Sequence, residues 1–74
     1  MKRKGALSRQ SGGSHYKNLK IQPAEYVEAN RLPYLDGSII YYATRHGSKG
    51  GAKDIRKIMH TCEIILKLRY RLNK

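Results

Sequence analysis

The chain has 74 residues, with 16 Lys and Arg against five Asp and Glu, which gives a formal net charge of +11. This length holds one domain at most and excludes a two-lobed enzyme with its own large core. The charge favours a negatively charged partner, and phosphate is the first candidate. The single cysteine, Cys62, excludes an internal disulfide and a zinc cluster of paired cysteines.

The first fourteen residues differ in composition from the rest of the chain. They contain four bases, no acid, and many Gly and Ser residues. Such a segment cannot bury enough apolar surface to offset the entropy of ordering it. We therefore predict a disordered basic arm over residues 1–14 and one helical domain over residues 15–74. The arm is either a tether for a polyanion or a solubilising tail. No apolar stretch follows the charged start, so we expect neither a secretion signal nor a membrane-spanning segment.

Three helices are predicted from the pattern of apolar residues and helix breakers, and the fold class is all-α. The first runs from about Pro23 to Asn30, with Tyr26 and Val27 facing inward. The second covers about residues 34–46 and contains a glycine, Gly37. That glycine indicates either a close neighbour at this point or a helix that begins after residue 36. The third runs uninterrupted over about residues 52–73.

The long third helix is predicted to pack through an apolar seam. Alternating three- and four-residue steps place one row on a single face: Ile55, Ile58, Cys62, Ile65, Arg69 and Leu72, widened by Met59 and Leu66. Ile64 and Leu68 lie off this row, which indicates a second contact surface. About fifty ordered residues without disulfides or metals are close to the limit for a single core. We therefore expect a homo-oligomer formed by a helical hairpin or three-helix protein.

No catalytic motif is recognisable, and no cofactor is predicted. The Gly47 to Gly51 turn lacks the spacing of a Walker loop. The three histidines, His15, His46 and His60, are too scattered to predict a metal site. Asp54 falls in the first turn of the third helix, where stabilisation of the helix dipole is the ordinary explanation for an acid.

An anion site is predicted where the second and third helices meet. Glycine-rich backbone before a helix N-terminus attracts anions, and Lys49 and Lys53 add positive charge there. Arg45, near the end of the second helix, has the geometry to bind a phosphate bidentately. The alternative is structural, with Arg45 complementing the helix dipole and Gly47 ending the second helix. Tyr16 and Tyr42 are candidates to pack against a base or ribose.

A second, independent pattern indicates nucleic-acid binding. Basic residues recur along one side of the third helix, and the candidate contacts are Lys57, His60, Lys67, Arg71 and Lys74. Such a ridge matches a nucleic-acid backbone and predicts salt-dependent binding without sequence preference. The alternative is the solvated back of an amphipathic helix.

Several short segments in unbroken order resemble the phage SaV-like family of small bacteriophage proteins. The segments are HYK at 15–17, IQP at 21–23, LDGSIIYY at 35–42, Arg45, Gly47, KG at 49–50 and DIRK at 54–57. A similar domain occurs within a deoxynucleoside monophosphate kinase of short-tailed coliphages. The resemblance therefore implies nucleotide handling in the cytoplasm of a phage-infected bacterium. The family pattern favours Asn at Ser38 and Lys at Tyr41, and losing that lysine removes a potential phosphate contact.

Three functions are left open by the sequence. The first is binding of a phosphorylated nucleotide, to modulate nucleotide pools or to sequester a host signalling nucleotide during host takeover or counter-defence. Its candidate ligand-binding residues are His15, Tyr16, Lys17, Tyr42, Arg45, Lys49 and Lys53. The second is a nucleic-acid-binding accessory protein, and the third is a component of a nucleoside monophosphate kinase.

Overall fold

The computed structural model describes residues 18–72 and shows an all-α fold with three helices. Helix α1 spans Pro23–Ala29, α2 spans Tyr34–Arg45, and α3 spans Ala52–Tyr70. The predicted helices are confirmed, with each C-terminal end one to three residues earlier than expected. The predicted arm over residues 1–14 lies outside the described residues.

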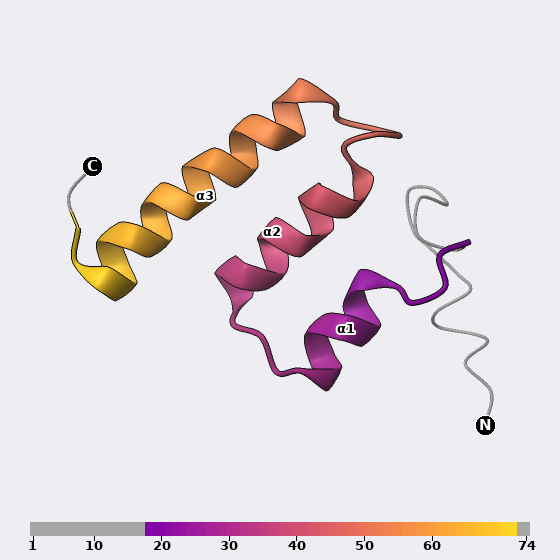
Figure 1. Ribbon diagram of the computed structural model, residues 1–74, viewed down its shortest axis with the longest axis horizontal. Coiled ribbons are helices and arrows are strands. Elements are labelled where there is room, and N and C mark those ends of the chain that lie inside the picture. Colours follow the sequence, from indigo (N-terminus) through magenta and orange to yellow (C-terminus); the bar gives the residue numbers. More distant parts are fainter. Residues whose placement is uncertain (1–17, 73–74) are drawn as a thin grey trace.

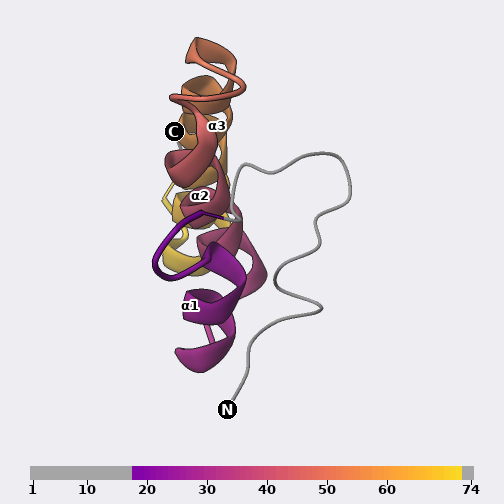
Figure 2. The same cartoon turned by 90° about the vertical axis from the view of Figure 1, so that its right-hand side faces the viewer.

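The helices form a single layer in which α2 lies in the middle (Figure 1). Helix α2 packs against both α1 and α3, and α3 runs antiparallel to it after a short turn. Seen from the side, the layer is thin (Figure 2), and the extents of the molecule are 44 × 27 × 18 Å. Stable domains usually have two or more packed layers around a core. A single layer leaves both of its faces open.

Helix α1 is short and depends on its N-terminal cap and its contact with α2. The backbone N–H of Gln22 donates to Glu25 Oε1 at 2.9 Å, as part of a capping box, and Pro23 begins the helix. Val27 of α1 packs over Gly37, which is buried inside α2. A Cβ added at Gly37 would lie 3.2 Å from Val27 Cγ1, so the close neighbour that the glycine indicated is this side chain. Tyr26, predicted to face inward, is 48% exposed.

Two ion pairs connect α2 and α3, one at each end of the antiparallel pair. At the turn, Arg45 of α2 binds Asp54 of α3. At the opposite end, Arg69 Nη2 of α3 lies 2.9 Å from Asp36 Oδ1 of α2, and this contact raises the pKa of Arg69. The arginine that interrupted the predicted apolar seam therefore has a charge partner on the neighbouring helix.

The register of α3 differs from the predicted seam. The buried positions on this helix are Asp54 and Thr61, whereas Ile55 is 38% exposed and Cys62 is exposed. Successive residues of a helix are 100° apart. Because Arg45 holds Asp54 against α2, Ile55 is turned away from the interface, and Cys62, one heptad later, is turned away with it. The hydrophobic pattern was therefore wrong for Ile55 and Cys62. Ile58 and Ile65 of the same predicted row are half-buried at the interface.

No aliphatic or aromatic side chain within residues 18–72 is fully buried. Nine large apolar residues in this range are instead exposed: Leu19, Ile21, Tyr26, Tyr34, Ile55, Met59, Leu68, Tyr70 and Leu72. The interface between α2 and α3 is made by half-buried side chains such as Ile58 and Ile65. The ion pairs at its two ends connect the helices in addition to this half-buried apolar contact.

Candidate functional site

The turn between α2 and α3 is organised around a bidentate contact between Arg45 and Asp54. Arg45 Nε donates to Asp54 Oδ2 at 2.8 Å, and Arg45 Nη2 donates to Asp54 Oδ1 at 3.1 Å. The Asp54 side chain is 1% exposed, whereas that of Arg45 is 28% exposed. Planar fork geometry of this kind is specific to arginine and a carboxylate or phosphate.

Glycine residues shape the backbone around this carboxylate. Gly51, the N-cap of α3, has a φ of 57°, a left-handed conformation that favours glycine. The backbone N–H of Gly50 donates to the Asp54 carboxylate. A Cβ added at Gly50 would collide with that carboxylate. Gly47 does not end α2 in a left-handed conformation, because His46 is the C-cap and Gly51 is the described glycine with positive φ.

The chain thus supplies its own anion at the turn where the sequence predicted an anion site. The hydrogen bond from Arg45 holds the pKa of Asp54 below its ordinary value of 3.8, and burial of the carboxyl opposes this effect. A carboxylate with a lowered pKa and both oxygens hydrogen-bonded is a weak proton acceptor. Asp54 is therefore a structural anion and is poorly suited to act as a general base.

Tyr42 connects this turn to the rest of α2 and α3. The Arg45 guanidinium carbon lies 4.9 Å from the centre of the Tyr42 ring, and Lys57 Nζ lies 5.5 Å from it. Both distances are within the range of cation–π attraction. Arg45 thus contacts Asp54 and Tyr42 at once, and Lys57 of α3 approaches the same ring.

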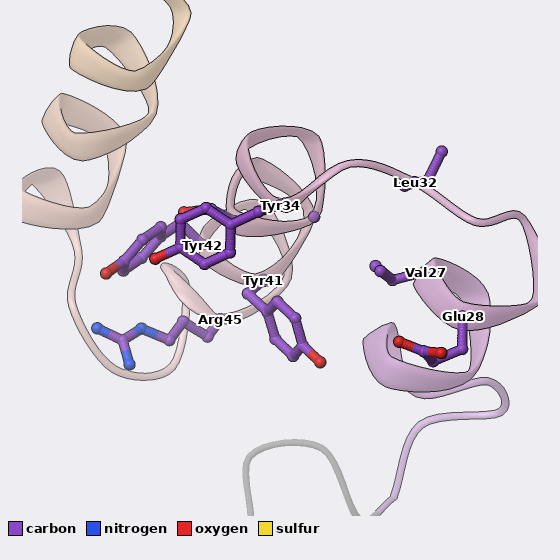
Figure 3. A pocket seen from close by; sticks show the side chains of 9 residues that line it. Val27, Glu28, Leu32, Tyr34, Tyr41, Tyr42 and Arg45 are labelled. Atoms are coloured by element: carbon purple, nitrogen blue, oxygen red, sulfur yellow. The ribbon is translucent and has the colours of Figure 1, made fainter. Parts of the chain in front are cut away.

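Two hollows meet at Tyr42 and Ser38. The first, of about 580 Å³, lies between α1 and α2; Figure 3 shows Val27 and Glu28 of α1 beside it, with Tyr41 and Arg45 of α2. Its remaining lining residues are Leu32, Tyr34, Gly37, Ser38 and Tyr42. The second, of about 440 Å³, lies between α2 and α3. It is lined by Ser38, Tyr42, Lys53, Arg56, Lys57, His60 and Thr61. We call these the tyrosine hollow and the basic hollow.

The structure brings together some of the predicted site residues and separates others. Tyr42 and Lys53 line the basic hollow, together with Lys57 and His60 from the alternative set. Arg45 lines the tyrosine hollow. The other described candidates, Lys49 in the turn and Lys67 and Arg71 towards the C-terminal end of α3, are exposed and line neither hollow. The candidates His15, Tyr16, Lys17 and Lys74 lie outside the described residues.

Sequence reasoning did not single out Ser38 or Arg56. Ser38 precedes Tyr42 by four residues, so one helical face carries both, and this spacing was a usable signal.

Among residues 18–72 there is no group of three or more His, Cys, Asp or Glu side chains that could hold a metal ion. None of the helices in that range has the length and apolar character needed to cross a bilayer.

The comparisons with known proteins identify a family. A family model described as a protein of unknown function (DUF3310) matches residues 10–63, which is most of the chain. The chain belongs to the DUF3310 family. The match contains the Arg45–Asp54 pair and every residue that lines the two hollows, and it ends inside α3. No curated protein and no solved structure matches the chain.

Proposed function

We propose that this DUF3310 protein binds a phosphorylated nucleotide in the tyrosine and basic hollows. The observation that carries the proposal is the position of Tyr42, whose ring lies beside two cations at the meeting point of an aromatic hollow and a cationic one. A nucleotide has the matching composition, because a planar base is joined through a sugar to a negatively charged phosphate.

The basic hollow is the proposed phosphate subsite. Lys53, Lys57 and His60 lie on successive turns of α3 and line this hollow, and so does Arg56. No acidic residue lines it. Ser38 adds a hydroxyl that can donate to a phosphate oxygen. Lysine ammonium groups contribute point charges that tolerate several phosphate positions, so the subsite accepts mono- or polyphosphates.

The tyrosine hollow is the proposed base and sugar subsite. Tyr34, Tyr41 and Tyr42 present flat apolar rings, each with a hydroxyl able to bond to a base edge or a ribose. Stacking of a base on an aromatic ring contributes about 1–3 kcal/mol. Arg45 lines the same hollow while it remains bound to Asp54, so its role is to fix the position of Tyr42.

The proposed biological role requires only that the protein binds a nucleotide and does not require it to catalyse a reaction. The resemblance to small phage proteins implies a setting in an infected bacterial cell, where a binder modulates nucleotide pools or sequesters a host signalling nucleotide. The segment at 15–17 and Lys49 belong to the same proposal as additional ligand contacts. Asp54, with its lowered pKa, gives little support to a phosphoryl-transfer reaction.

The test is a thermal-shift and calorimetric screen of linear and cyclic nucleoside phosphates at moderate salt. Lys57→Gln is the diagnostic variant, and Lys67→Gln is its matched control, because both remove one exposed lysine charge from α3. Loss of one charge-assisted contact worth about 1.5 kcal/mol weakens binding about tenfold. We expect this loss for Lys57→Gln and near-unchanged affinity for Lys67→Gln. A panel without any stabilising nucleotide would refute the proposal.

Tyr42→Leu tests the aromatic part of the site. This change keeps apolar bulk and removes both the ring and the hydroxyl, so affinity should fall while the helical circular dichroism signal is retained. Arg45→Ala is a poor choice for this purpose, because it leaves Asp54 buried without its partner and perturbs the fold. If the Tyr42→Leu variant bound the nucleotide as tightly as the wild type, the base would not contact Tyr42.

Nucleic-acid binding is the second candidate, and one observation favours it. Exposed basic side chains lie along α3 and at its C-terminal end. They are Lys53, Arg56, Lys57, His60, Lys67 and Arg71. A phosphate backbone following this helix would contact Lys57 and Lys67 alike, and its affinity would fall steeply with salt. Equal losses for Lys57→Gln and Lys67→Gln in a DNA or RNA binding assay, without any nucleotide binding, would favour this function.

A further inference from the structure

Helix α3 carries an apolar stripe on the side away from the basic hollow. The stripe consists of Ile55, Met59, Cys62 and Leu66. Ile55 is 38% exposed, Met59 is 60% exposed, Cys62 is exposed and Leu66 is half-buried. At 100° per residue these four lie within about 60° of one another around the helix. No charged residue interrupts them, and α2 leaves most of this surface uncovered.

The spacing of the stripe is the same in both directions along the chain. Its steps are four, three and four residues, so an antiparallel copy presents an identical row. A two-fold axis between Met59 and Cys62 places Ile55 opposite Leu66 of a second copy. It also places Met59 opposite Cys62 of that copy. Isologous dimers require this kind of self-complementary surface.

The charges beside the stripe agree with the same axis. Arg56 and Glu63 lie on one flank of the stripe, seven residues apart. In the antiparallel arrangement, Arg56 of each copy falls beside Glu63 of the other, which gives two opposite-charge pairs per dimer. Glu63 is 61% exposed in the single chain, and its described ion contact is a long one, 3.9 Å to His60 Nδ1. Parallel docking about a two-fold axis along the helices would instead place this flank of the two copies on opposite sides of the interface, so Arg56 and Glu63 would not meet.

The single-layer fold explains why a second copy is needed. Within residues 18–72 no aliphatic or aromatic side chain is fully buried. Because α2 and the stripe contact α3 from directions roughly 90° apart, docking two copies also brings their α2 helices together. The result is a four-helix arrangement of two layers, which supplies the core that one layer lacks.

We propose that this protein forms an antiparallel homodimer through the apolar stripe of α3, with Arg56 and Glu63 paired across the interface. The dimer leaves the basic and tyrosine hollows on its outer surfaces, and of the residues that line them Arg56 alone also takes part in the proposed interface. Met59→Glu, which changes no residue of either hollow, therefore tests the dimer separately from the proposed function.

The first experiment measures mass by sedimentation equilibrium at moderate salt. A chain of 8.5 kDa should sediment as a particle of about twice that mass. Arg56→Glu and Glu63→Arg should each shift the population towards monomer, because each places like charges across the interface. The double variant should restore the dimer. Arg56 and Glu63 are both exposed in the single chain, so its fold tolerates these changes. A wild-type chain that stays monomeric at high concentration overturns the proposal, as does a double variant that fails to recover.

The second experiment uses a matched pair of apolar-to-acid changes. Met59 and Leu68 are 60% and 66% exposed on the same helix, but only Met59 belongs to the stripe. Met59→Glu should weaken dimerisation by at least about tenfold, while Leu68→Glu should leave the dimer intact. The reverse order of effects would assign the interface to the other side of α3.

The third experiment determines the direction of docking by disulfide formation in a Cys62→Ala background. Ile55→Cys alone and Leu66→Cys alone should give little cross-linked dimer on oxidation. A mixture of the two single variants should cross-link efficiently, because residue 55 of one copy faces residue 66 of the other. Cross-linking of each variant with itself would show parallel docking and overturn the proposed axis.

Discussion

The glycines of the turn provide a direct test of the contact between Arg45 and Asp54. Gly47 and Gly50 lie in the same turn, and neither has the positive φ that would strain an alanine. Nothing lies within 4 Å of a Cβ added at Gly47, whereas a Cβ added at Gly50 falls on the Asp54 carboxylate. Gly47→Ala is therefore the matched control for Gly50→Ala.

The expected free energies have opposite signs. Gly47→Ala should stabilise the fold by about 0.4–1 kcal/mol, because alanine lowers the entropy of the unfolded chain. Gly50→Ala should destabilise it by about 1–3 kcal/mol, the usual cost of forcing an extra carbon into packed surroundings. The cost arises because Asp54 is short, 1% exposed and held by two hydrogen bonds, so it cannot move aside freely. In a domain of this size the two melting temperatures should differ by at least about 6 °C.

The assay is unfolding in urea, followed by circular dichroism. An Asp54→Ala background completes a double-mutant cycle. The three atoms nearest to the added Cβ all belong to the Asp54 carboxyl group, so without the carboxylate Gly50→Ala should be less destabilising. Equal destabilisation by Gly50→Ala in both backgrounds would show that the carboxylate is not the cause. The same conclusion would follow if Gly47→Ala and Gly50→Ala had equal effects in the wild-type chain.

Three further predictions address other contacts. Because the folded pKa of Asp54 is lowered, the stability that its carboxylate contributes is present above pH 3.8 and is lost as the pH falls through the folded value. The urea concentration at the midpoint of unfolding should rise with pH between about pH 2 and pH 6 in the wild type. It should rise less in Asp54→Asn. Asp36→Arg and Arg69→Asp should each lower the melting temperature, and the double variant should recover it, because the exchanged pair re-forms between α2 and α3. Gly37→Ala should gain about 1 kcal/mol in helix propensity only in a Val27→Ala background, where the tight 3.2 Å contact is removed; equal gains in both backgrounds would contradict the packing described.

The three helices were predictable because their signals are local. Proline at the start of α1, the Arg-Leu-Pro break and the glycine-rich turn each act within a few residues, so the boundaries came within three residues of those observed. The packing register of α3 was not predictable in this way. It depends on a contact between residues nine positions apart, and a buried aspartate outweighs the apolar pattern that favoured Ile55 and Cys62.

The candidate site was predictable in part. Arg45 and the glycine turn indicated an anion site, and in the structure the Asp54 carboxylate of the chain itself binds Arg45 at this turn. The tyrosine hollow was harder to foresee, because it depends on how α1 packs against α2 through Val27 and Gly37. Lys53 was predicted in the same site as Tyr42, whereas Lys57 and His60 were assigned to a separate function. Only the three-dimensional structure shows that these two share a hollow with Tyr42 and Lys53.

The Arg45–Asp54 pair illustrates a more general limit on the prediction of anion sites from sequence. An arginine, a glycine turn and a helix N-terminus specify where an anion binds but not whether it comes from solvent or from the chain. Asp54 occupies the third position of α3, from which a carboxylate can reach back to the N–H groups before the helix, as in a capping box. An acidic residue at that position therefore competes with any external phosphate for the same donors. In this protein we therefore place the proposed phosphate subsite in the basic hollow, which Lys53 and Lys57 line together with Tyr42.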